Sequence, residues 1–242
     1  MLQWSQRAID SADGDPSAGD LLSGRRSRSP TRPAVSRGYC LGRPGWSDDL
    51  RRGLAMARET GSFSYATVVA YVYFPGIPLG VLAAHDRAVR EIEDALRIAE
   101  RSGDDMAVAF DRVILGLALA HRDSEAERDR GLRLLTEVRD VLEHESHNLS
   151  ELRLVNVYLA REQARHGDRD QAIVQIRAAL DQLVCEGQLL SWGGIPATAV
   201  LVETLLDRGG DGDVCEAEVA LERLAAVPVL DGLAIRDVWL LR

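Results

Sequence analysis

The chain of 242 residues contains no lysine, so all 29 of its basic side chains are arginines. This absence excludes several classes of enzyme. A Walker-type phosphate loop and a protein-kinase core each depend on a lysine, and Schiff-base catalysis uses a lysine amine. The motifs GxSxG, HExxH and GxGxxG are also missing. The sequence therefore offers no motif for catalysis, and we expect a protein that is not an enzyme.

Cysteines and aromatic residues are few. Cys40, Cys185 and Cys215 are far apart and form no CxxC pair, so we expect three unpaired thiols rather than disulfides or a zinc site. Unpaired thiols, together with an N-terminus that lacks the apolar core of a signal peptide, indicate a cytoplasmic protein. Aromatic residues make up only 5% of the chain, which disfavours an all-β core.

Positive charge is in deficit, because 38 acidic residues give a formal net charge of −9. An acidic protein lacks the surplus of cations that neutralises phosphates, so we expect no direct binding of nucleic acid. The charge is also unevenly distributed: residues 24–43 carry six arginines and no acid. The sequence predicts an irregular, partly disordered segment over residues 1–46 and a patterned domain over residues 47–242.

One uncharged stretch, residues 66–84, is about long enough to cross a membrane. Pro75 and Pro78 interrupt it, and proline removes a backbone donor and clashes with the preceding helical turn. We therefore expect no membrane span. Instead, the stretch predicts a buried helix that ends near Phe74, then a kink and a second short helical piece.

Start and stop signals for helices recur from Ser47 onward. Ser47 followed by two acids predicts the first helix start, and the S-x-x-E pattern of Ser124 and Glu127 predicts a capping box. Residues 113–120 are apolar on every side, which predicts complete burial. Further starts are predicted at Asp86, Asp104, Asn148, Asp168 and about Ala197, and helix ends at Gly61, Gly103, Gly167 and Gly209.

The predicted helices come in pairs. The first helices of successive pairs begin near residues 86, 126, 169 and 214, which are 40, 43 and 45 residues apart. Such a period is typical of stacked helical hairpins. The sequence therefore predicts an all-α fold, a TPR-like helical-hairpin repeat (an α-solenoid) of about 8–10 helices. An irregular all-helical bundle is the alternative.

We expect no cofactor and no metal. The turn at 209–213 resembles part of a calcium loop, but Cys215 and Glu216 occupy positions that need an oxygen ligand and a glycine. His144 and His147 lack a third ligand at a suitable spacing. The triplet beginning at His121 matches a kinase HRD motif without the asparagine that must follow, so we interpret it as a helix end.

Six strings carry a resemblance to a known family: CLGRPGW (40–46), EDALRIAERSGDD (93–105), LALAHRDSEAERDRGLRLLTEVRD (117–140), VYLARE (157–162), EGQLL (186–190) and VETLLDRGGDGDVCEAE (202–218). Together they resemble the C-terminal TPR-like helical region of mycobacterial adenylate/guanylate cyclase–ATPase regulators, some of which are transcriptional regulators with a LuxR-type DNA-binding domain. The resemblance implies a sensor or interaction platform. It transfers no catalytic residue, because the cyclase aspartates and the ATPase lysine belong to domains that do not appear in this sequence.

The sequence thus favours a non-catalytic helical-repeat module that binds a protein or peptide partner in signal transduction. Trp46 and Trp192 are the candidate contact residues, because tryptophan is enriched at binding hot spots; ordinary packing between helices is the alternative. We also expect self-association, since an uncapped repeat end leaves an apolar face.

Two other functions stay open. The chain could be a ligand-sensing fragment that acts in trans on a cyclase/ATPase regulator. It could also be a gene remnant without independent function, because the Arg/Pro/Ser run at 25–38 replaces an apolar helix of the family and suggests a shifted reading frame.

Overall fold

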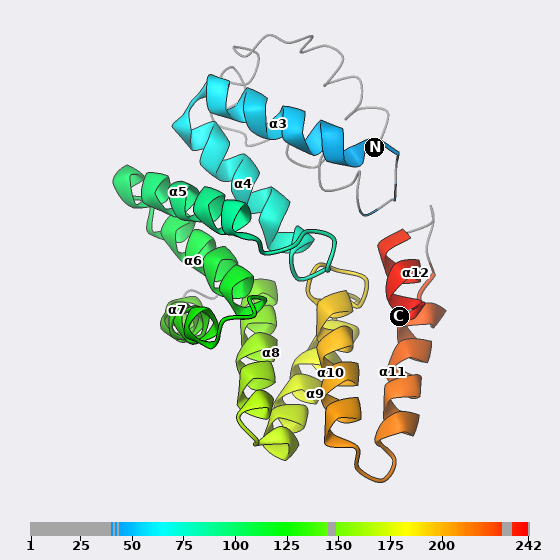
Figure 1. The fold of residues 1–242 in the computed structure, drawn as a ribbon. Coiled ribbons are helices and arrows are strands. Elements are labelled where there is room, and N and C mark those ends of the chain that lie inside the picture. Colours follow the sequence, from blue (N-terminus) through cyan, green and yellow to red (C-terminus); the bar gives the residue numbers. More distant parts are fainter. Residues whose placement is uncertain (1–39, 41, 43, 145–148, 229–233, 242) are drawn as a thin grey trace. The chain divides into compact units, whose positions relative to one another are not determined.

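The computed structural model describes residues 40, 42, 44–144, 149–228 and 234–241. Within these residues the fold is all-α, as predicted, with ten helices and no strand (Figure 1). The predicted irregular segment 1–46 lies mostly outside the described residues and stays a prediction. The helices are α3 (Trp46–Thr60), α4 (Ser62–Gly76), α5 (Asp86–Ser102), α6 (Asp105–Ala120), α7 (Glu125–His144), α8 (Leu149–Arg165), α9 (Arg169–Cys185), α10 (Gly194–Arg208), α11 (Asp213–Ala226) and α12 (Ala234–Leu240).

The chain forms two compact units, residues 1–114 and 115–242. The division falls within α6, whose segment 113–120 is buried at every position, as its apolar sequence predicts. In the first unit, α4 packs against both α3 and α5. The ring of Phe110 on α6 lies 5.1 Å from that of Phe74 on α4 and adds an aromatic contact to this core.

The start of α3 differs from the prediction. The N-cap residue is Gly45, in the left-handed conformation at φ 82°, and no side chain caps this helix. The helix therefore begins at Trp46, one residue before the predicted cap Ser47. Asp48 and Asp49 do lie in the first turn, where acidic side chains favour the positive end of the helix dipole.

The apolar stretch after α3 contains one helix rather than two, so the predicted second helical piece was wrong. Helix α4 continues through Pro75 and ends at Gly76, two residues beyond Phe74. The backbone carbonyl of Gly76 then accepts hydrogen bonds from the amides of Val81 and Leu82, at 3.0 and 2.9 Å. These bonds fold the chain back in a turn, and Gly80 adopts a positive φ of 67° within it. Among the described residues, no helix combines the length and apolarity that a membrane span requires.

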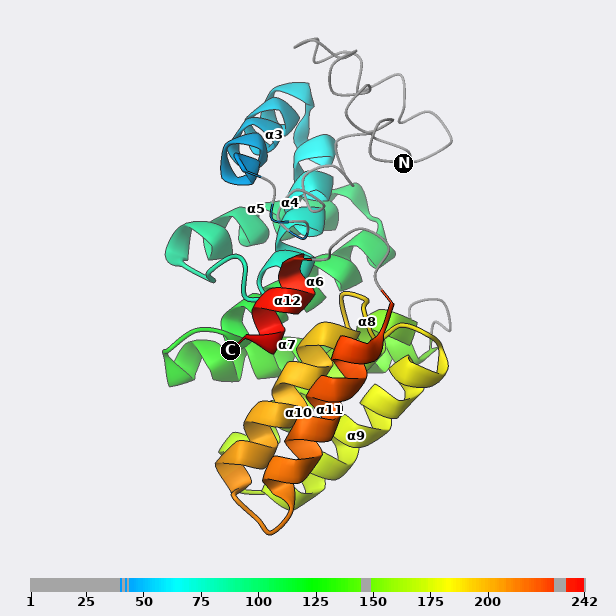
Figure 2. The same ribbon diagram turned by 90° about the vertical axis from the view of Figure 1, so that its right-hand side faces the viewer.

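The second unit is a series of helical hairpins (Figures 1 and 2). Helix α8 packs against α7 and α9, and α10 packs against α9 and α11. Helix α10 also contacts α8, and α12 contacts both α10 and α11. Within this unit neighbouring helices pack as the hairpin repeat predicts. The observed starts of α5, α7, α9 and α11, at residues 86, 125, 169 and 213, also match the predicted starts.

Most predicted caps are present. The carboxylate of Asp104 accepts from the amides of Met106 and Ala107, and that of Asp168 accepts from the amide of Gln171. Ser124 accepts from the amide of Glu127, but the Glu127 carboxylate pairs with Arg122 instead of completing the capping box. Asn148 lies outside the described residues.

Helix α10 begins earlier than the predicted start near Ala197. Its first residue is Gly194, and the hydroxyl of Ser191 accepts from the amides of Gly193 and Gly194 at 3.2 Å each. A β-carbon at Gly194 would lie 2.3 Å from the carbonyl oxygen of Leu189. The helix start therefore requires glycine at this position, which the sequence pattern alone did not reveal.

Candidate functional site

The two predicted contact residues lie in different units. Trp46 is the first residue of α3 and is partly buried. Trp192 lies in the turn between α9 and α10, and 41% of its surface is exposed. Its exposure is consistent with a contact role, and both residues stay predictions.

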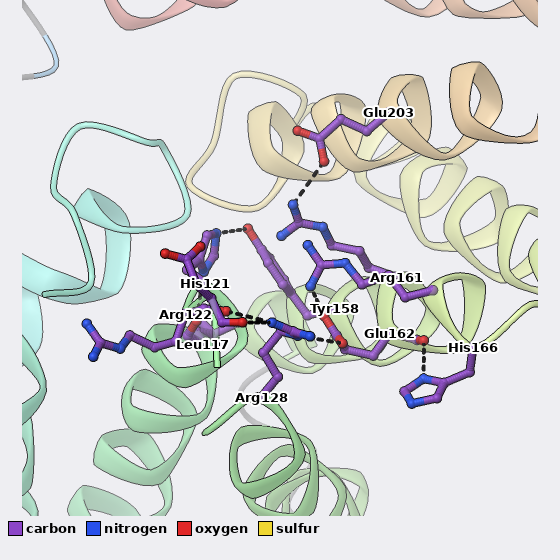
Figure 3. Close-up of polar contacts among 11 residues, drawn as sticks. Leu117, His121, Arg122, Arg128, Tyr158, Arg161, Glu162, His166 and Glu203 are labelled. Carbon is purple, nitrogen blue, oxygen red and sulfur yellow. Dashed lines mark hydrogen bonds and ion pairs between the residues drawn. The ribbon is translucent and has the colours of Figure 1, made fainter. Parts of the chain in front are cut away.

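A polar cluster, which we call the α8 cluster, joins α8 to its neighbours in the second unit (Figure 3). His121 follows the end of α6, and its Nδ1 lies 2.7 Å from the carbonyl oxygen of Leu117. Because a carbonyl only accepts, Nδ1 carries the proton and Nε2 is the acceptor. The hydroxyl of Tyr158, 3.1 Å away, therefore donates to Nε2 of His121. The members of the cluster are His121, Arg128, Tyr158, Arg161, Glu162 and Glu203.

Glu162 is the most buried acid of this cluster, with 2% of its surface exposed. Its carboxylate pairs with Arg165 one turn along α8 and, at 3.9 Å, with Arg128 of α7. Arg128 also donates to the backbone carbonyls of Arg122 and Asp123, at 3.1 and 2.6 Å. The guanidinium of Arg128 thus connects the turn before α7 to the buried face of α8.

Arg161 extends the cluster to α10. It pairs with the Glu203 carboxylate at 3.0 Å, and its guanidinium lies 5.7 Å from the ring centroid of Tyr158. Burial lowers the pKa of His121 to about 4, and burial raises the pKa of Tyr158 above its ordinary value. Neither group exchanges a proton near neutral pH, so the arrangement suits the fixing of helix positions and not general acid–base catalysis.

The first unit contains two buried acids. The Glu91 carboxylate accepts from the Tyr73 hydroxyl at 2.6 Å, from Arg58 at 3.0 Å and from Arg87 at 3.2 Å. Asp111 on α6 has 4% of its surface exposed, and burial raises its pKa to about 7. Sequence reasoning missed both residues, although an acid on the buried side of an apolar helix is a signal that could have revealed Asp111.

The acidic turn at 209–213 is occupied by protein groups. The Asp213 carboxylate is buried, accepts from the guanidinium of Arg208 at 2.5 and 2.9 Å, and accepts from the amide of Gly210 at 2.7 Å. These bonds lower the pKa of Asp213 to about 2. No group of three or more metal-ligating side chains occurs among the described residues. His147 lies outside them, so the pair with His144 is not described.

Exposed apolar side chains gather in the second unit. Of the ten large hydrophobic residues that are exposed in the described part of the chain, eight lie between Val174 and Leu241. They occupy α9, the following turn, α10, α11, α12 and the turn residue after α12. Exposed apolar side chains mark an interaction site where they form one contiguous surface, whereas single ones are common on any soluble protein. The eight are Val174, Val184, Trp192, Leu206, Val214, Val219, Val238 and Leu241.

Comparison with known proteins found no match to the chain among family models, curated proteins or solved structures.

Proposed function

We propose that the chain is a non-catalytic helical-repeat module that binds a protein or peptide through helices α9–α12. The observation that carries this proposal is the concentration of exposed apolar side chains on these helices. Val214 and Val174 are 60% and 54% exposed, although both lie in well-formed helices of a packed unit. Transfer of such side chains from water to a partner surface is favourable, at about 25 cal/mol per Å² of apolar area.

Trp192 adds a second element to this proposal. It lies in the turn between α9 and α10, within the same stretch of chain as the exposed valines. Tryptophan contributes a large contact area and frequently dominates binding energies. We expect Trp192 to anchor the partner, while Trp46 in the first unit contributes less.

The proton equilibria of the α8 cluster support a structural role for its residues. His121 and Tyr158 keep their pKa values far from neutral, because burial disfavours their charged forms. Arg161 and Arg128 pair with carboxylates of other helices, and Arg128 also donates to a carbonyl of the turn before α7. These groups serve the packing of the repeat, which presents its outer surface for binding.

The resemblance to the C-terminal region of cyclase/ATPase regulators suggests signal transduction as the setting and such a regulator as a partner to test. Site-specific photo-crosslinking in cells tests the proposal directly. A photoreactive residue at Trp192, Leu206 or Val214 is expected to capture a protein, whereas the same residue at Glu59 of α3 or Glu137 of α7 captures none. Equal capture at all five positions, or none at the first three, would overturn the proposal.

A further inference from the structure

The outer surface of α9 and α11 is acidic as well as apolar. The two helices together carry six acids and three arginines, and some of this charge is paired: Arg177 binds Glu216, and Arg208 of α10 binds both Asp170 and Asp213. The other two arginines, Arg169 and Arg223, are exposed. Asp181, Glu218 and Glu222 are exposed and form no ion pair within the described part of the chain. Three carboxylates are therefore available to a partner on these two helices.

Helical spacing places these acids beside exposed valines. On α11 the buried residues Asp213, Ala217, Ala220 and Leu224 define one side, and Glu218, Val219 and Glu222 project from the opposite side. On α9 the outward residues include Val174 and Asp181, which are two helical turns apart. We call this surface the α9–α11 face; it consists of Val174, Asp181, Val184, Val214, Glu218, Val219 and Glu222.

The two helices contribute to one surface because they are bridged. The guanidinium of Arg177 on α9 donates to the Glu216 carboxylate on α11 at 2.5 Å. Both helices run in the same direction, since each is joined to α10 by a hairpin, and in Figure 2 α11 lies between α10 and α9. Asp181 lies one turn after Arg177, and Val219 lies one turn after Glu216. The bridge thus has an acidic residue one turn further along α9 and a valine one turn further along α11.

We propose that the α9–α11 face binds a basic amphipathic helix of a partner protein. The apolar side of that helix packs on the valines, and its arginine or lysine side chains pair with Asp181, Glu218 and Glu222. Amphipathic helices recognise protein surfaces through apolar side chains at three- and four-residue spacing, and charge complementarity selects among them. This inference rests on the proposed function, because it names the partner chemistry of the same surface.

Charge also argues against a second copy of this chain as the occupant. The protein carries a formal net charge of −9, and a symmetric dimer through this face would place one acidic surface against a copy of itself. Like charges across an interface are costly. A basic partner turns the same carboxylates into attractive contacts.

Binding of designed peptides to the full chain tests the inference. Two helical peptides of about 18 residues, or five turns, are designed with the same apolar face of leucine and alanine. The polar face carries arginine in the first and glutamate in the second. Fluorescence anisotropy is expected to show at least about tenfold tighter binding of the basic peptide, with the difference shrinking as salt rises. Alkylation of the exposed Cys215, on the outer side of α11, is expected to slow when the peptide binds.

Matched variants locate the contact. The double variant Glu218→Arg with Glu222→Arg is expected to weaken the basic peptide about tenfold and to strengthen the acidic one. Glu59→Arg with Glu137→Arg makes the same change in net charge on α3 and α7 and is expected to leave binding unchanged.

The apolar contacts are tested separately. Val214→Ser with Val219→Ser is expected to weaken binding, whereas Val141→Ser, at an exposed valine of α7, is not. The conservative Glu218→Gln with Glu222→Gln removes charge with little risk to folding, and circular dichroism checks each variant.

The outcomes separate the two proposals. Equal binding of both peptides, equal effects of the two arginine variants, or no binding of either peptide overturns the basic-helix inference. If crosslinking still captures a protein on α9–α12 in those cases, the proposed function stands. Reversible dimerisation of the chain that Val214→Ser with Val219→Ser abolishes would also overturn the inference, because a second copy would then occupy the face.

Discussion

The hydroxyl of Tyr158 on α8 donates a hydrogen bond to Nε2 of His121 at the end of α6, across 3.1 Å. The other ring nitrogen of His121 donates to the carbonyl of Leu117, so both nitrogens are used by the neutral imidazole. Protonation of Nε2 would reverse this bond, because the Tyr158 hydroxyl would then have to accept from the ring. The hydroxyl therefore donates to His121 only while the imidazole is neutral.

This pairing predicts a pH dependence of stability. Burial lowers the pKa of His121 from 6.5 to about 4 in the folded protein. Between these values the unfolded chain binds the proton more readily, so stability is complete above the unfolded pKa and is lost as the pH falls toward 4. The loss amounts to as much as about 3 kcal/mol, at 1.36 kcal/mol per pKa unit. Urea denaturation between pH 4 and 8 measures it.

His166 provides a matched control for this prediction. Its Nδ1 also lies 2.7 Å from the carbonyl four residues earlier, that of Glu162, but the residue is exposed. His121→Gln is expected to flatten the decline between pH 6.5 and 4, and His166→Gln to leave it intact. An unchanged profile in His121→Gln would show that other groups cause the decline.

Asp111 is predicted to act in the opposite direction. Burial raises its pKa from 3.8 to about 7, so the folded protein keeps a proton that the unfolded chain releases. Its contribution to the stability of the first unit therefore falls as the pH rises from about 4 to 7, by as much as about 4 kcal/mol. Asp111→Asn cannot ionise and is expected to be more stable than the wild type at pH 8 and to lose this dependence.

Hydrogen exchange of amides in residues 44–114 measures this effect within the unit that contains Asp111. The control is Asp105→Asn, at an exposed position in the first turn of the same helix, with an expected change below about 0.5 kcal/mol. Equal protection in Asp111→Asn and the wild type at pH 8 would contradict the prediction.

Much of the fold could be predicted from the sequence because its signals are local. Gly103 ends α5 at φ 70°, and Asp104 and Asp168 cap the next helices, as their positions in the sequence indicate. The start of α10 and the segment after α4 were mispredicted for contrasting reasons. The start of α10 depends on Ser191, three residues before the helix, and the chain after α4 turns back through bonds to the carbonyl of Gly76.

The α8 cluster and the Glu91 site could not be predicted, because their partners are distant in sequence. Tyr158 is 37 residues from His121, and Glu91 is 33 residues from Arg58. No local period links such pairs. The exposed valines could not be predicted, because a helical pattern of apolar residues ordinarily indicates the buried face, whereas Val174 and Val219 lie on the outer faces of α9 and α11. Trp192 was predicted from its residue type, and 41% of its surface is exposed in the structure.

Glu91 is predicted to stabilise the first unit strongly. Its buried carboxylate is the common acceptor for Tyr73, Arg58 and Arg87. Glu91→Ala leaves the Tyr73 hydroxyl buried without this acceptor, while the two arginines can regain water because they are more than half exposed. We expect a loss of about 3 kcal/mol, at the lower end for a broken buried ion pair. Thermal and urea denaturation measure this loss. The control is Asp94→Ala, which removes an exposed pair with Arg97 and is expected to lower the free energy of unfolding by about 0.5 kcal/mol or less.

Gly131 is predicted to resist a substitution that ordinarily stabilises helices. Alanine is favoured over glycine within a helix by about 1 kcal/mol. A β-carbon at Gly131 of α7, however, would lie 2.8 Å from the carbonyl oxygen of Gly116 and 2.9 Å from the β-carbon of Leu119, both on α6. The first of these atoms is backbone and the second is fixed to it, so the two helices would have to move apart. Gly131→Ala is therefore expected to destabilise the second unit by about 1–3 kcal/mol, as overpacked cores do.

Urea denaturation compares it with Arg133→Ala at an exposed position of the same helix, which is expected to change stability by less than about 0.5 kcal/mol. A stabilising effect of Gly131→Ala would show that α6 and α7 do not approach as closely as their backbones indicate.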